Sequence, residues 1–434
     1  MTHDVIVVGA RCAGAALAAL LARAGVRTLV LDADELPCDM PMSTHYIQPP
    51  GMDVLDDLGV GDAVRAATPA TRCILLQADH ARVLSRYPDE RAGYCPRRVT
   101  VDTLLQQAAV EAGAELRDRH RVVELVRDGE RVAGVVVETP EGRQTLRAGL
   151  VVGADGRKST IARLAGVEEY LSFEMTRGGY WFYFPTPELW KSDSRYEFDS
   201  YIGWQGDGLR YIFQCDGDLL LMVAVPPNAE ARAWGQDYKQ KTIEYLRANE
   251  ITGPLVAQSE PEGKGVGLLK ASFFYRRPVG PGFALVGDAG NFKDFVTGHG
   301  MTDAYLSAKR LATAIIDGNE RAFERYWRVR DAESLPLYLD AMRVGEVGFN
   351  DAFTRLLFEH AARDPELADR MALVAERRIS PHELVPTSQM MRWVLAAALR
   401  GRFDVVKAFM HTGKRMGEFQ REIALRGQLA ASLA

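Results

Sequence analysis

The first thirty-five residues contain two kinds of apolar pattern, one typical of buried strands and one typical of a helix. Residues 5–8 and 28–31 are short, continuous apolar runs, which are typical of strands buried on both faces. Between them, residues 15–24 are rich in strong helix formers and end before Gly25, a residue that favours helix termination. The pattern therefore predicts a strand, a turn, a helix and a second parallel strand.

Strand and helix patterns continue to alternate along the chain. Apolar spacing predicts a helix over 99–113, and a β-ribbon over 122–137 turns at Asp128-Gly129. Two further buried strands are expected near 150–153 and 283–286, the second followed by a helix starting near Thr302.

From about residue 319 to the end the pattern is helical. One apolar stripe over 390–410 also carries Arg392, Arg400, Arg402 and Lys407. We interpret this stripe as a core-packing or dimer helix, and a helix on a membrane surface is the alternative.

Residues 170–275 differ from both flanks, because Val, Phe and Tyr runs alternate with Gly/Asp turns. This pattern predicts an inserted β-sheet. Between residues 170 and 213 lie 14 of the chain's 38 aromatic residues. An ordinary sheet core is one explanation, and the concentration favours the pocket wall of an apolar or aromatic ligand. The candidate wall residues are Tyr180, Tyr183, Tyr201, Trp204, Tyr211 and Phe213.

Composition narrows the function classes. The 434 residues carry a formal charge of −5, which gives no basic face for nucleic acid. No apolar run is long enough to span a membrane, and the N-terminus does not resemble a signal peptide, so we expect a cytoplasmic protein without a membrane partner. Five widely spaced cysteines without CxxC, and the absence of HExxH, argue against a disulfide framework and a metal site.

The first turn carries the parts of a dinucleotide site. Gly9 permits a tight turn, and Gly14 lets the helix approach the strand closely. The helix N-terminus attracts a pyrophosphate, and Asp32 is placed to accept hydrogen bonds from ribose hydroxyls. Arg11 stands where the GxGxxG pattern has its middle glycine. The acid at position 32 favours FAD or NAD over NADP.

Two later turns add to this site. Asp155-Gly156 follows the strand at 150–153, and Gly287-Asp288 follows the strand at 283–286. Gly298, Gly300 and Met301 then precede the helix that starts near Thr302.

The three ordered motifs resemble the FAD-dependent monooxygenases of the para-hydroxybenzoate hydroxylase fold, the group A flavoprotein monooxygenases, over residues 1 to about 330. The resemblance implies an α/β fold in which a discontinuous, Rossmann-like FAD-binding domain holds an inserted, mainly antiparallel β-sheet substrate domain. The FAD domain would comprise 1–75, 97–169 and 276–330, the substrate domain 76–96 and 170–275, and a C-terminal helical region 331–434.

The resemblance also implies residue roles. Gly9, Arg11, Gly14 and Asp32 would lie at the ADP half of FAD, and Arg98, or the adjacent Arg97, at the ribityl–phosphate region. Asp155 and Gly156 would support the pyrophosphate, and Gly287 and Asp288 the ribityl chain. Gly298, Gly300 and Met301 would place backbone N–H groups at the flavin ring, where they stabilise its anionic reduced form. The family usually has proline at the position of Phe295.

Two histidines are candidate catalytic residues. His45 lies in a polar loop that passes near the flavin in the family, and His299 lies inside the Gly298–Gly300 loop. For His45, a loop histidine bonded to backbone is the alternative, and for His299 it stays open whether the side chain lies near the flavin edge.

The implied reaction is transfer of one oxygen atom from O2, through a flavin C4a-hydroperoxide, to a hydrophobic, aromatic or polyketide-like small molecule. NADH or NADPH would supply electrons, directly or through a separate flavin reductase. The sequence leaves open whether the protein forms a homodimer. A prenyl reductase is the first alternative, because residues 180–185 approach the Tyr-x-Trp-x-Phe-Pro pattern, with Phe182 in place of Trp. A halogenase is disfavoured, because its chemistry needs a lysine in the N-terminal third and none precedes Lys158. A non-catalytic flavin-binding protein is the remaining alternative.

Overall fold

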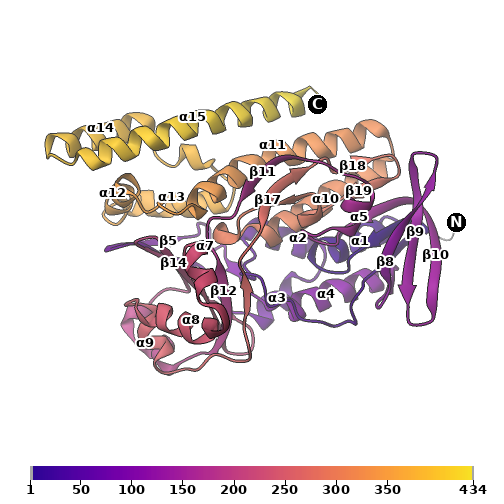
Figure 1. Ribbon diagram of the computed structural model, residues 1–434, viewed down its shortest axis with the longest axis horizontal. Coiled ribbons are helices and arrows are strands. Elements are labelled where there is room, and N and C mark those ends of the chain that lie inside the picture. The colour runs from indigo at the N-terminus through magenta and orange to yellow at the C-terminus, as the bar shows by residue number, and fades with distance from the viewer. Residues whose placement is uncertain (1–2, 433–434) are drawn as a thin grey trace.

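The computed structural model describes residues 3–432, and the centre of its first layer is β1 (His3–Val8) (Figure 1). This strand is parallel to β2 (Thr28–Leu31) on one side and to β10 (Gly142–Gly153) on the other. Val7 lies opposite Val30 in the register with β2. Because each of these strands has neighbours on both sides and helices or strands on both faces, their continuous apolar runs are buried, apart from the half-buried Leu150.

The carboxyl ends of β1, β10 and β19 (Phe283–Leu285) lie at one edge of this eight-stranded sheet, since the three strands are parallel. Each strand leads at that edge into one of the glycine-containing turns predicted from the sequence. In open α/β sheets this edge is where ligands bind.

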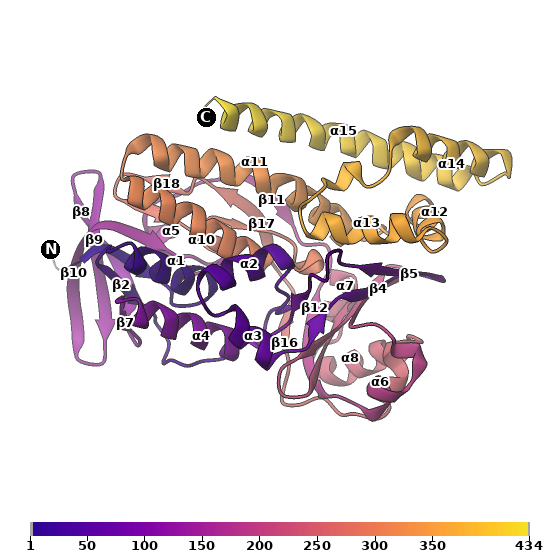
Figure 2. The ribbon, with the colours of Figure 1, turned by 180° about the vertical axis from the view of Figure 1, so that it is seen from behind.

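Helices cover one face of the sheet, and a ribbon covers the other. The helical face is formed by α1 (Cys12–Arg23), α4 (Arg98–Glu111) and α10 (Gly300–Asp317), which share one hydrophobic core with the sheet (Figure 2). The ribbon of β8 (Arg121–Asp128) and β9 (Arg131–Thr139) packs with β10 on the opposite face. The predicted Rossmann-like layer is confirmed.

The inserted domain is a second, mainly antiparallel sheet, as predicted. Its only parallel pair within the described residues joins β13 to β4, and β4 begins before the predicted domain boundary at 75/76. In spatial order the strands are β16 (Val266–Leu268), β12 (Gly179–Pro185), β15 (Leu219–Val225), β14 (Gly208–Cys215), β13 (Ser200–Gln205), β4 (Cys73–Ala78) and β5 (Ala81–Arg86).

Both faces of this second sheet are covered. On one face lie α8 (Tyr238–Arg247) and α9 (Thr252–Val256), and on the other lie the C-terminal helices and the end of the first domain. A three-stranded sheet of β11 (Glu169–Glu174), β17 (Ser272–Arg276) and β20 (Asn291–Phe292) connects the two domains.

The C-terminal region is helical, as predicted, but its details differ from the sequence pattern. Helix α11 (Glu320–Gly345) runs through the expected boundary at 330/331 without interruption. The stripe at 390–410 is a helical hairpin, because Gly401 takes a left-handed φ of 78° and reverses the chain. None of the helices within residues 3–432 combines the length and the apolar character that crossing a bilayer requires. The other helices of the region are α12 (Ala352–Ala361), α13 (Pro365–Ala375), α14 (Thr387–Leu399) and α15 (Phe403–Ala431).

The connections hold short elements. These are α2 (Pro49–Asp57), α3 (Gly61–Ala67), β3 (Ala70–Thr71), β6 (Gly93–Tyr94), β7 (Glu115–Arg117), α5 (Thr160–Leu164), α6 (Glu188–Ser192), α7 (Asn228–Ala233) and β18 (Val279–Gly280).

Candidate active site

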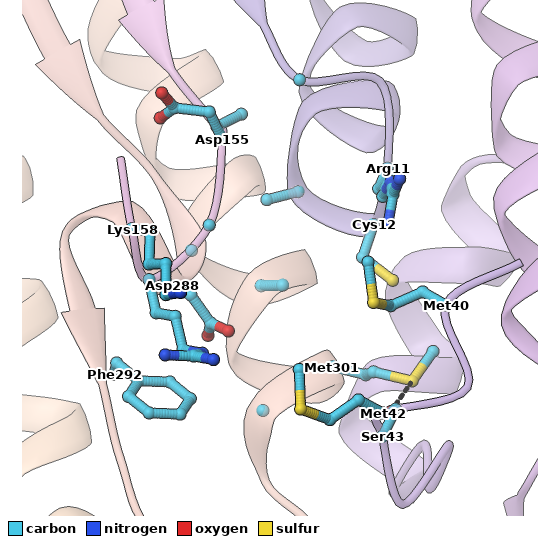
Figure 3. A pocket seen from close by; sticks show the side chains of 18 of the residues that line it. Arg11, Cys12, Met40, Met42, Ser43, Asp155, Lys158, Asp288, Phe292 and Met301 are labelled. Carbon is cyan, nitrogen blue, oxygen red and sulfur yellow. Dashed lines mark hydrogen bonds between the residues drawn. The ribbon is translucent and has the colours of Figure 1, made fainter. Parts of the chain in front are cut away.

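A cavity of about 610 Å³ opens at the carboxyl edge of the first sheet and reaches the second sheet (Figure 3). Segments far apart in the sequence line it, because the three parallel strands deliver their turns to one place. The structure brings together eleven of the twelve residues predicted to bind a cofactor: Gly9, Arg11, Asp32, Arg98, Asp155, Gly156, Gly287, Asp288, Gly298, Gly300 and Met301.

The turn after β1 is closely packed and depends on two glycines. Gly9 has a left-handed φ of 106°, and a Cβ there would lie 2.5 Å from the carbonyl oxygen of Ala154. Gly14 does not line the cavity but packs behind it, where a Cβ would lie 1.8 Å from the Gly9 carbonyl oxygen. Both positions require glycine, and they bring the start of α1 to the cavity.

Arg11 replaces the middle glycine without strain. Its backbone is extended, with φ −105° and ψ −163°, a conformation that any residue adopts. Its Nη2 donates to Asp34 Oδ2 at 2.6 Å, so the guanidinium is held at the mouth of the turn. The nearly buried Asp32 accepts from Ala10 N at 2.8 Å and Asp34 N at 3.0 Å. Its carboxylate is therefore fixed at the end of β2.

The structure resolves the register of the two arginines before α4. Arg98 lines the cavity, and its Nη2 donates to Asp102 Oδ2 at 2.7 Å. Arg97 points elsewhere, with its Nε donating to Asp216 Oδ2 at 3.2 Å. Arg98 therefore presents a partly buried cation, paired with Asp102, to the cavity, and Arg97 does not.

The two later acidic residues differ in their environment. Asp155 accepts from Ser159 Oγ at 2.5 Å and from Thr160 N at 2.7 Å, so its carboxylate holds the start of α5. Asp288 points into the cavity, and its carboxylate has no hydrogen bond to any other described residue (Figure 3). Burial raises the pKa of Asp288 to about 6. A half-buried carboxylate without a protein partner is available to accept a hydrogen bond from a ligand in the cavity.

The loop before α10 is a built helix N-terminus. Asp294 Oδ1 accepts from Val296 N at 3.1 Å, and Gly298 takes a left-handed φ of 65° before α10 begins at Gly300. The backbone N–H groups of the first turn of an 18-residue helix therefore face the cavity wall, where they favour negative charge.

The profile of the family described as "FAD binding domain" matches residues 2–333, about three quarters of the chain. The chain belongs to this family. The residues around the cavity fit FAD, because two glycine positions leave no room for a side chain, Asp288 presents a carboxylate without a protein partner, and the first turn of α10 lines the cavity. The predicted cofactor and fold family are confirmed.

Proteins named for different activities are similar in sequence or in structure to this chain. A 12-dehydrotetracycline 5-monooxygenase/anhydrotetracycline 6-monooxygenase of Streptomyces rimosus is 34% identical over 39% of this chain, and the chain covers only 33% of that relative. A digeranylgeranylglycerophospholipid reductase of Methanocella arvoryzae is 27% identical over 75% of this chain and 81% of its own. Among solved structures, the myxobacterial chondrochloren halogenase CndH covers 99% of this chain and 97% of its own at a TM-score of 0.70 and 20% identity. The last likeness shows the fold alone, including the C-terminal helices.

Both candidate catalytic histidines lie behind the wall of the FAD cavity. His299 is 4% exposed, and its Nδ1 lies 2.6 Å from Gln48 Oε1. Burial lowers the pKa of His299 well below its usual range, so the neutral ring donates to this amide oxygen. Gln48 Nε2 in turn donates to the carbonyl of Thr297 at 3.3 Å. His299 therefore holds the FAD loop in place and does not contact the cavity.

His45 is paired with an aromatic residue of the second sheet. It is fully buried at a left-handed φ of 56°, and its Nε2 lies 2.5 Å from the Tyr183 hydroxyl. His45 Nδ1 has no partner among the described residues. The pair joins the loop around Ser43 and Thr44, which lines the cavity, to β12.

Only part of the aromatic cluster faces the first domain. Tyr180 and Tyr201 lie on the opposite face, where their hydroxyls donate to Ala231 O at 2.9 Å and Gln77 Oε1 at 3.0 Å. Since both faces of the sheet are buried, the sequence could not indicate the phase of these strands, and the assignment of both residues to the wall is corrected. Trp204, Tyr211 and Phe213 lie on the face that points toward the first domain, but each contacts protein there. Trp204 packs on Phe349 and Phe358, the Tyr211 hydroxyl donates to the Val296 carbonyl, and Phe213 stacks on Tyr46.

The residue that reaches the cavity from this cluster is Trp181, which was not among the predicted wall residues. It alternates with Tyr180 on β12, and its ring meets Phe295 edge-on with centroids 4.9 Å apart. Its buried Nε1–H has no partner among the described residues. Met40, Met42 and Phe292, which were not predicted, complete the apolar end of the cavity together with the predicted Met301. The three methionine side chains gather on one side, and Phe292 lies across from them (Figure 3).

Within residues 3–432, no group of three or more His, Cys, Asp or Glu side chains is placed to hold a metal ion.

Proposed function

We propose that this protein is an FAD-dependent monooxygenase that transfers one oxygen atom from O2 to a hydrophobic, aromatic or polyketide-like small molecule. The observation that carries this proposal is the end of the FAD cavity formed by Trp181, Phe295 and the methionines. It offers apolar surface together with one unpaired, buried N–H donor, that of Trp181 Nε1. This combination suits an aromatic substrate with a phenol or ketone oxygen.

When bound, FAD supplies the electron transfer and the oxygen chemistry. The chain's own residues position and insulate it. The N–H groups at the start of α10 would stabilise negative charge on a bound flavin, and the Trp181–Phe295 pair would exclude water from the adjacent space. Phe295 thereby fills the position where the family usually has proline.

The relatives support the proposal in different ways. The Streptomyces rimosus relative is named for oxygenation of anhydrotetracycline, and we propose a substrate of similar hydrophobic, aromatic character for this chain. The electron donor is NADH or NADPH, used directly or through a separate reductase in the cytoplasm, and the experiment below includes each route.

A prenyl-type reductase is the second candidate, and one observation favours it. The Methanocella arvoryzae reductase matches a larger share of this chain than the monooxygenase does, at lower identity. A halogenase is less consistent with the cavity. Two lysines, Lys158 and Lys293, line the cavity, and Lys293 forms an ion pair with Asp303. No lysine precedes Lys158 in the sequence, so the N-terminal lysine that would handle an oxidised halide is absent.

The test measures oxygen and NAD(P)H consumption by the FAD-loaded protein with a panel of phenols and polycyclic aromatics, with and without an added flavin reductase. A monooxygenase consumes O2 and NAD(P)H in a substrate-stimulated manner. Substrate reduction that proceeds equally well without oxygen would replace the proposal with the reductase, and a flavin that no donor reduces would indicate a non-catalytic flavin-binding protein.

A further inference from the structure

The hairpin of α14 and α15 carries a row of large apolar side chains that face solvent. Met391, Leu395 and Leu399 recur every fourth residue along one side of α14, and Phe403 and Met410 follow on α15. These five side chains are between 53% and 82% exposed, and Leu399, beside the turn, is the most exposed. Single exposed apolar residues are common, but a continuous row is characteristic of an interaction surface.

The fold of the hairpin does not depend on this row. The inward sides of both helices form a separate core, in which Phe353 meets Phe409 with ring centroids 5.0 Å apart. Trp393 stacks on His360 with centroids 4.0 Å apart. Figures 1 and 2 show the closed end of the hairpin projecting past α12, on the side remote from the β8–β9 ribbon.

Basic residues alternate with the apolar row. Arg392 and Arg400 are exposed on α14 and at the turn, and Lys407 and Lys414 lie on the same side of α15 as Phe403 and Met410. Residues 387–414 contain five Arg and Lys against one Asp, a net charge of +4, although the whole chain carries −5. The hairpin is thus a cationic and apolar surface on an otherwise anionic protein.

We propose that the closed end of this hairpin docks on an anionic phospholipid membrane. Leu399 and Phe403 would enter the boundary between headgroups and acyl chains, and Arg400 and Lys407 would contact lipid phosphates. The absence of a membrane-spanning helix is compatible with this mode of binding, because the hairpin lies at the surface.

A second copy of the chain suits this surface less well. A two-fold symmetric dimer places the same patch of both subunits face to face, so the two sets of basic side chains would be brought together. Like charges across an interface oppose association. An anionic bilayer instead satisfies both the basic and the apolar side chains.

The test is vesicle flotation of the full-length, FAD-loaded protein, and it requires no enzymatic activity. The vesicles are phosphatidylcholine alone and phosphatidylcholine mixed with phosphatidylglycerol. We expect the wild type to float with the anionic vesicles and to be released by salt. Leu399→Asp combined with Phe403→Asp should lower the partition coefficient by about tenfold or more. Arg400→Gln with Lys407→Gln should lower it by about fivefold for each charge removed.

The matched control is Val110→Asp combined with Ile316→Asp, two changes at exposed apolar positions of α4 and α10 away from the hairpin. This variant adds the same charge and should float like the wild type. Equal loss of flotation in the control, or no flotation of the wild type with anionic vesicles, would overturn the proposal. So would a concentration-dependent dimer that only the Leu399/Phe403 variant disrupts, since the row would then be an interface between copies.

Discussion

The hydroxyl of Tyr183 lies 2.5 Å from Nε2 of His45, and the two rings are stacked with an interplanar angle of 5°. Burial lowers the pKa of His45 to about 3, so the imidazole is neutral over the working pH range. Tyr183 therefore donates to Nε2, because burial raises the pKa of its hydroxyl. This bond connects the second sheet to the loop that forms one wall of the FAD cavity.

Removing the Tyr183 hydroxyl should affect turnover more than FAD binding. In Tyr183→Phe, the His45 imidazole loses its side-chain hydrogen bond and the loop around Ser43 loosens. We therefore expect kcat/KM to fall by about tenfold, equivalent to one buried hydrogen bond. The matched control is Tyr180→Phe on the opposite face of the same strand, which should retain wild-type kcat/KM. Steady-state kinetics decide, and equal losses in both variants would contradict the account.

The turn after β1 gives a test of the FAD site. Gly9→Ala forces a Cβ to within 2.5 Å of the Ala154 carbonyl oxygen, so it should reduce FAD affinity by about tenfold or more. Gly25→Ala is the control, since Gly25 also has a positive φ, of 80°, but its Cβ would meet no atom within 4 Å. It should cost about 1 kcal/mol of stability and retain FAD. The ratio of flavin to protein after purification and dialysis measures the difference, and full flavin content in Gly9→Ala would be the contrary result.

Trp181 gives a test of the proposed substrate wall. Trp181→Phe removes the buried N–H donor and leaves space beside Phe295, and we expect KM for phenolic or ketone substrates to rise by about tenfold with FAD content unchanged. Trp204→Phe removes an equally unpaired buried N–H, but Trp204 packs on Phe349 away from the cavity. That control should keep its KM, and a similar rise in both would show that the effect is structural.

The buried Asp294 should make stability depend on pH. Burial raises its pKa to about 7, above the 3.8 of an ordinary aspartate, so the folded state retains a proton that the unfolded chain releases. The resulting stabilisation is present below about pH 4 and is lost as the pH rises through 7. Asp294→Asn keeps an acceptor for Val296 N and does not titrate.

The difference in unfolding free energy between Asp294→Asn and the wild type should therefore shift in favour of the variant by about 2–4 kcal/mol from pH 5 to pH 8. His45 and His299 are buried in neutral form, so the folded protein loses stability as the pH falls below about 6.5. Both histidines are present in the wild type and in the variant, so their contributions cancel in the difference. Denaturant titrations at several pH values measure the difference. A difference that is constant with pH would show that Asp294 is ionised throughout.

The first domain could be predicted from the sequence because its signals are local. The run at residues 5–8, the turn at Gly9 and the acid at position 32 lie within one strand–helix–strand unit, and the structure differs mainly at the helix start, Cys12 instead of residue 15. Because the strands are parallel, their carboxyl ends lie at the same edge of the sheet, and most of the cofactor candidates therefore meet at one cavity.

The substrate wall could not be predicted in the same way. On β12, Tyr180 and Trp181 are both apolar and both buried, so alternation gives no information on which of them faces the cavity. His299 presents a related difficulty, because only the tertiary contact with Gln48, 251 residues away, shows that it positions the loop. At the C-terminus a local signal existed: Gly401 between two arginines marks the turn of the hairpin.

The most direct test of the central proposal is turnover in isotopically labelled O2 by the FAD-loaded protein with NAD(P)H and a converted aromatic substrate. The account predicts a product that carries one labelled oxygen atom for each O2 and NAD(P)H consumed. A product without label, formed at an unchanged rate in the absence of oxygen, would contradict it.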